Sequence, residues 1–92
     1  MLNAAIEADD SSPQLRKKAN SILEILKNSI CHILTKGIEY GQIKKTVDKN
    51  YFATVMIASL EGGIMMSKLN RSDKDIRIVI RHLESMIKEI EV

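Results

Sequence analysis

Apolar residues recur along much of this chain at steps of three and four, the spacing of a helix with one buried side. The first stripe consists of Leu15, Ala19, Ile22, Leu26, Ile30, Ile33 and Gly37. A later one consists of Ile76, Val79, Ile80, Leu83, Met86, Ile87 and Ile90. The pattern therefore predicts long helices over about residues 13–40 and from about residue 72 to the C-terminus.

The segment between them, about 49–70, is apolar around most of a helical circumference. At about 100° per residue, one stripe comprises Phe52, Met56, Ser59, Gly63 and Met66. Beside it runs a second stripe of Ala53, Ile57, Leu60 and Ile64. Such a helix must be covered from more than one side. A chain of 92 residues has few helices to offer, so we expect a second copy to cover the remainder.

Polar and special residues mark the expected helix ends. Ser12 precedes a proline and suits an N-cap, and Asp48 is a good cap for the middle helix. Gly41 offers the left-handed backbone that ends helices. Ser72 followed by Asp75 has the spacing of a capping box, so we expect the last helix to start at Ser72.

Length and composition favour one all-α domain spanning residues 1–92. Aromatic residues make up 3% of the chain, and strands favour aromatic residues. Leu2, Ala5 and Ile6 have helical spacing and predict a short N-terminal helical stub. Short loops favour antiparallel neighbours. The predicted architecture is therefore three long antiparallel helices plus the stub.

The charge pattern argues against nucleic-acid binding by this chain. The net charge is +2, acids and bases are interspersed, and the densest basic run is Arg16-Lys17-Lys18. Nucleic-acid surfaces need a basic stripe and a reading element. A single cysteine, Cys31, favours a reducing, cytoplasmic setting. No apolar run approaches the length needed to span a bilayer, so we expect no membrane contact.

Residues that carry catalysis or bind metals are scattered. His32 and His82 lie on different predicted helices, and Cys31 is adjacent to His32 but points about 100° away. Gly62-Gly63 lacks the spacing of a phosphate loop; glycines within a helix instead indicate close helix approach. We expect no enzyme activity, no metal and no cofactor.

Three segments together resemble the C-terminal domain of TetR-family transcriptional regulators. The first is Met1 to Ala8 with the helix-breaking segment Asp9-Asp10-Ser11-Ser12-Pro13 that follows it. The second is Gly41-Gln42-Ile43 with Val47-Asp48. The third is Ser59-Leu60-Glu61-Gly62-Gly63-Ile64. The match covers nearly the whole chain and keeps the order and spacing of the three segments.

This resemblance implies a repressor fragment whose last two helices form a four-helix bundle with those of a second subunit, without the DNA-binding helix-turn-helix head. The residues expected at the homodimer interface are Phe52, Met56, Ser59, Gly63, Met66, Val79, Leu83, Met86 and Ile87. The resemblance also implies a pocket for a small apolar effector. Candidate lining residues are Ile22, Leu26, Ile30, Ile57 and Met65.

Two alternatives to the regulator interpretation remain open from the sequence. The chain could be a stand-alone dimeric helical adaptor, or a small protein that binds an apolar ligand. The upstream part of the reading frame distinguishes these alternatives. If about fifty upstream residues encoded a helix-turn-helix head, the adaptor would be excluded.

Overall fold

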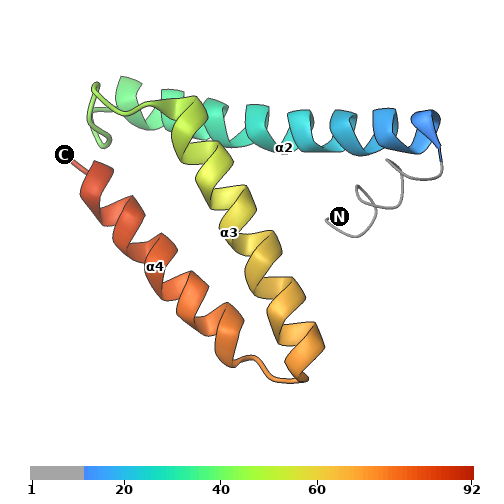
Figure 1. Cartoon of the computed structure of the whole chain (residues 1–92). Coiled ribbons are helices and arrows are strands. Elements are labelled where there is room, and N and C mark those ends of the chain that lie inside the picture. Colours follow the sequence, from blue (N-terminus) through green and yellow to red (C-terminus); the bar gives the residue numbers. More distant parts are fainter. Residues whose placement is uncertain (1–11) are drawn as a thin grey trace.

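The computed structural model describes residues 12–92, and this part of the chain folds into three helices without a strand (Figure 1). They are α2 (Pro13–Glu39), α3 (Lys49–Asn70) and α4 (Lys74–Ile90). The all-α prediction is confirmed, and the helix bounds agree with the apolar pattern to within two residues. The predicted stub at Leu2, Ala5 and Ile6 lies outside the described residues.

Side chains and backbone end the helices largely where the sequence indicated. Ser12 Oγ accepts a hydrogen bond from the Leu15 amide at 3.4 Å. Asp48 Oδ1 accepts one from the Tyr51 amide at 3.1 Å. Gly41 has a φ of 72°, in the left-handed region that favours glycine. These interactions satisfy backbone groups that a helix end leaves without partners.

The expected capping box at Ser72 is wrong. Helix α4 begins at Lys74, with Asp73 at the cap position. Ser72 Oγ instead accepts from the Lys74 amide at 3.2 Å, and Asp75 Oδ2 accepts from Asn70 Nδ2 at 2.8 Å. The tight turn after α3 holds the Ser72 amide against the Ser67 carbonyl, 3.0 Å away, so this amide cannot serve the reciprocal bond of a capping box.

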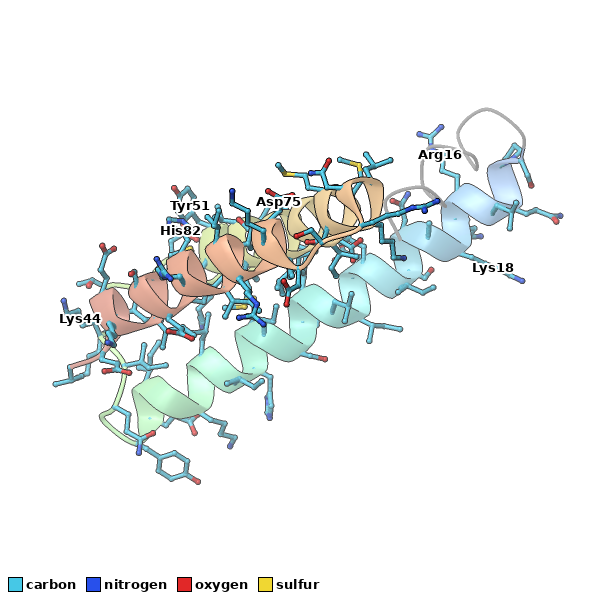
Figure 2. All side chains as sticks on the ribbon, turned by 90° about the horizontal axis from the view of Figure 1, so that it is seen from below. Arg16, Lys18, Lys44, Tyr51, Asp75 and His82 are labelled. Atoms are coloured by element: carbon cyan, nitrogen blue, oxygen red, sulfur yellow. The ribbon has the colours of Figure 1, made fainter. Side chains whose placement is uncertain are left out.

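The helices lie in two layers. Helices α3 and α4 run antiparallel side by side, and α2 crosses the N-terminal half of α3 obliquely (Figure 1). In the view from below, α2 forms one layer and the α3–α4 pair the other (Figure 2). Helix α3 is therefore the central element, since it packs against both of the others.

The hydrophobic core is small for a chain of this length. Only five apolar side chains are buried among the described residues: Leu34, Phe52, Ala53, Ile57 and Leu83. The radius of gyration is 15.2 Å, whereas a compact domain of this length has about 12 Å. The accessible surface is 6999 Å², against about 5400 Å² for a compact chain of this mass. The helices thus leave much apolar surface uncovered.

A short connection, here named the C-terminal clasp, joins residues 42–44 of the α2–α3 loop to residues 90–92. The Lys44 amide donates to the Ile90 carbonyl at 2.8 Å, and the Val92 amide donates to the Gln42 carbonyl at 3.0 Å. Lys44 Nζ also donates to the Glu89 carbonyl at 2.9 Å. A cation near the last carbonyls of a helix is favourable, so the loop both pairs with and caps the end of α4.

One helix contradicts the expectation that no segment has the length and composition to span a membrane. Among the described helices, α3 alone is long and apolar enough to pass that test. The core helix of a soluble protein passes the same test, so this is weak evidence for a membrane. In this fold the same apolar character lets α3 pack on two neighbours at once.

Candidate dimerisation and ligand surfaces

The α3–α4 layer has an outer face, turned away from α2. Figure 2 shows Tyr51 and Asp75 on this side of the layer. Leu69 follows Tyr51 by eighteen residues, which is five full helical turns, so both point in the same direction. Tyr51 is 66% exposed and Leu69 is 76% exposed. The outer face is therefore open to solvent at both ends of α3.

The middle of the outer face is made of small residues. Ala58 and Gly62 lie within about 20° of the Tyr51 direction on the helical wheel, and Ala58 is exposed. A Cβ added to Gly62 would meet nothing within 4 Å. Packing within the chain therefore does not require glycine at this position.

The neighbouring glycine has the opposite environment. A Cβ added to Gly63 would lie 2.9 Å from Ile76 Cδ1 and 2.9 Å from Val79 Cγ2. Gly63 is buried, and it allows α4 to approach α3 closely inside one chain. The two adjacent glycines thus belong to different surfaces of α3.

A groove indents the layer where α3 begins and α4 ends. It has a volume of about 520 Å³. Its apolar lining includes Val47, Val55 and Met86, and its polar lining includes Asp48 and Glu89. Tyr51 and His82 also line it, from α3 and α4 respectively. Lys44 lines it as well, so the groove combines apolar side chains with charged groups of both signs.

Comparison with known proteins relates this arrangement to one family. The family model described as "Tetracyclin repressor-like, C-terminal domain" matches residues 1–83. The chain belongs to this family. This result confirms the TetR resemblance inferred from the three sequence segments.

Two solved TetR structures are similar to the chain over nearly its whole length. A TetR-family transcriptional regulator from Cytophaga hutchinsonii has 35% identity and a TM-score of 0.94 over 99% of this chain. A TetR transcriptional regulator from Chloroflexus aurantiacus J-10-FL has 29% identity and a TM-score of 0.93 over 98%. This chain spans 46% of the length of each. No curated protein sequence matches the chain.

In this TetR-type domain, the residues expected at a dimer interface fall into two groups. Three are buried within the chain: Phe52, which also lines the groove, Gly63 and Leu83. The others retain accessible surface: Met56, Ser59, Val79 and Met86 in part, and Met66 and Ile87 more fully. Within the α3 part of this set, Gly63 packs against Ile76 and Val79 of α4 in the same chain, whereas Met66 stays exposed.

The outer face also presents residues that were not among the sequence candidates. In α3 they are Tyr51, Ala58, Gly62 and Leu69, which lie along one line. In α4, Ile78 is 57% exposed and lies one turn from both Asp75 and His82. An isoleucine among charged residues of a helix was the sequence signal that could have indicated a second apolar surface on α4. The structure explains it by placing Ile78 on the outer face.

The five candidate effector-pocket residues are not equally accessible. Ile57 is buried in the core, Ile30 and Met65 are partly buried, and Ile22 and Leu26 are exposed. Ile22 contributes to an open hollow of about 600 Å³ on α2, with four polar neighbours from the same helix. That hollow is shallow and one-sided, so α2 alone does not enclose a ligand.

No metal centre accompanies these surfaces in the described part of the chain. Three or more His, Cys, Asp or Glu side chains do not gather there in a group suited to a metal ion. Cys31 is a free, partly buried thiol. His82 lines the groove described above.

Proposed function

We propose that this chain is the dimerisation and effector-sensing part of a cytoplasmic TetR-type transcriptional regulator, and that it has no enzymatic role. The observation that carries the proposal is the apolar, uncovered outer face of α3 and α4 in a chain of this family. DNA reading would belong to parts of such a regulator outside residues 1–92.

The amount of uncovered surface supports a homodimer. The accessible surface of 6999 Å² exceeds that of a compact chain of this mass by about 1600 Å². A standard interface buries about 800 Å² on each partner. The excess is thus large enough to supply one such interface.

The remaining apolar surface lies largely on α2 and supports the sensing role. Leu15, Ile22, Ile25, Leu26 and Ile33 are all exposed there. Exposed apolar patches of this extent indicate a binding surface rather than a solvated one. We assign these exposed residues of α2, with the partly buried Ile30 on the same helix, to one wall of a cavity for a small apolar effector.

Sedimentation of a charge variant tests the dimerisation part. Leu69→Glu places a charge on the outer face, and desolvating an unpaired charge is costly. We expect the wild-type chain to sediment as a dimer and Leu69→Glu as a folded monomer, with helicity checked by circular dichroism. The matched control is Asn50→Glu, at an exposed polar position of the same helix, which should stay dimeric. A folded wild-type monomer at tens of micromolar would overturn the proposal.

Thermal-shift measurements test the sensing part. A panel of small hydrophobic compounds should include some that raise the melting temperature, because a ligand that binds only the folded state stabilises it. Ile22→Asp and Leu26→Asp should reduce that increase. A flat response across the panel would count against an effector site in this chain.

A further inference from the structure

The outer face also determines how two copies would pair. We propose that α3 packs antiparallel against α3 of a second copy, about a two-fold axis level with Leu60, so that Leu69 of each copy enters the groove beside Tyr51 of the other. This inference rests on the proposed dimerisation and adds its register and the contacts at its ends.

The spacing of residues along the outer face is symmetric. Tyr51 and Leu69 lie nine residues before and after Leu60, and Ala58 and Gly62 lie two before and after it. Large side chains thus stand at both ends and small ones in the middle. A two-fold axis that crosses the outer face at the height of Leu60 exchanges the members of each pair. This exchange is the condition for an isologous contact.

The small residues fit the centre of such a contact. With the axis at Leu60, Ala58 of one copy faces Gly62 of the other. Small residues let two helix backbones approach closely. The space beyond Gly62 is empty within the chain, so a second backbone can occupy it.

The groove suits the end of α3 that would reach it. Val47, Val55 and Met86 give it an apolar lining, and Leu69 is the most exposed large apolar side chain of the described helices. Charges also agree. Two carboxylates, Asp48 and Glu89, line the groove together with one cation, Lys44, whose Nζ already donates to the Glu89 carbonyl. Lys68 and Arg71 lie near Leu69 in the sequence. The antiparallel register brings these opposite charges together, which favours correct pairing over wrong partners.

A parallel pair would be less favourable. It would set Lys68 and Arg71 of one copy beside the same residues of the other, and like charges at an interface are repulsive. It would also leave each groove without an apolar occupant. The observed surface therefore favours the antiparallel register.

Cysteine crosslinking tests the register in the full chain. With Cys31→Ser as background, the double variant Tyr51→Cys/Leu69→Cys is treated with a short flexible bis-maleimide. Within one chain the two positions are about 27 Å apart along α3, so such a reagent cannot join them. We expect covalent dimers from the double variant, with a residue 51 to residue 69 link identified by mass spectrometry. The matched controls, Tyr51→Cys alone and Leu69→Cys alone, should give none.

Other outcomes separate the register from dimerisation itself. Covalent dimers from either single variant, in a protein that sediments as a dimer, would show parallel packing and overturn the register alone. A dimer without any crosslink would place the interface elsewhere and also overturn it. A chain that sediments as a monomer would remove the proposed dimerisation together with this inference.

Discussion

At the scale of single residues, Gly62 and Gly63 show how adjacent positions serve different surfaces. Glycine within a helix costs about 1 kcal/mol relative to alanine, so each position needs a compensating reason. For Gly63 that reason is α4, which leaves no room for a Cβ beside Ile76 and Val79. For Gly62 the space is open within the chain, and the compensation would come from the second copy.

Alanine substitutions distinguish these two roles. Gly63→Ala forces a Cβ against Val79, whose β-branched side chain has little rotamer freedom. Overpacking costs about 1–3 kcal/mol, which exceeds the helix-propensity gain. We expect Gly63→Ala to lower the melting temperature. Gly62→Ala should keep the fold and weaken dimerisation, as measured by sedimentation equilibrium. Equal effects of both substitutions on unfolding would contradict the assignment.

The two helix N-caps should differ in their importance for global stability. Asp48 caps α3, which supplies three of the five buried core residues. Ser12 caps the end of α2 that extends beyond α3 (Figure 1). Asp48→Ala should therefore lower the free energy of unfolding by about 1 kcal/mol, whereas Ser12→Ala should only fray the first turn of α2. Urea unfolding followed by circular dichroism measures the difference, and equal losses would refute it.

Helix ends could be predicted from the sequence where the capping residue interacts only with its own neighbours along the chain. Ser12, Gly41 and Asp48 act through their own backbone neighbourhood, so the sequence alone identified them. Ser72 and Asp75 carry the same kind of signal, but the α3–α4 turn engages the Ser72 amide and Asn70 engages Asp75. Tertiary context therefore overrode a local motif at this turn.

At the scale of helices, the C-terminal clasp connects α2 to α4, which do not pack against each other directly. Ile43, in the middle of the loop segment, lies over Gly37 of α2 and forms a bridge with Glu91. A displacement of α2 near Gly37 therefore has a direct route to the end of α4.

Gly37→Ala should open the clasp. The added Cβ would lie 2.8 Å from Ile43 Cγ1. Because a β-branched side chain has little rotamer freedom, we expect Ile43 and the loop that carries it to move away from α2. We expect faster hydrogen exchange at the amides of Lys44 and Val92, which donate across the clasp. Asn28→Ala, at an exposed position of α2, is the control and should leave both rates unchanged. Unchanged exchange in Gly37→Ala would show that the loop is held independently of α2.

The apolar pattern predicted the extent of each helix but not which side of α3 meets which neighbour. A helix with one apolar stripe, such as α4, can pack in only one orientation. Helix α3 is apolar around most of its circumference, so several orientations bury similar area. Close packing decided between them, since only Gly63 and not Gly62 faces α4. Phe52 and Gly63, two of the residues predicted at the interface, are buried within the chain for this reason, and the interface itself stays a prediction.

At the scale of the whole molecule, the fold class followed from composition and periodicity, and the apolar circumference of residues 49–70 already indicated that one chain has too few helices to cover it. The pattern did not give the arrangement of the helices, and so could not give the shape of the molecule. Here five buried side chains support a chain whose radius of gyration of 15.2 Å is well above the roughly 12 Å of a compact domain. Its stability should therefore depend on what covers the outer face.

The melting temperature should consequently rise with protein concentration. For a dimer that unfolds to two chains, a tenfold higher concentration adds about 1.4 kcal/mol of stability. For about 180 residues unfolding together, this corresponds to roughly 3–6 °C. Thermal unfolding followed by circular dichroism over a hundredfold concentration range measures the effect. The monomeric Leu69→Glu variant should melt at a lower, concentration-independent temperature. If the wild-type chain also melted independently of concentration, its small core would have to suffice on its own, and the outer face would need a different explanation.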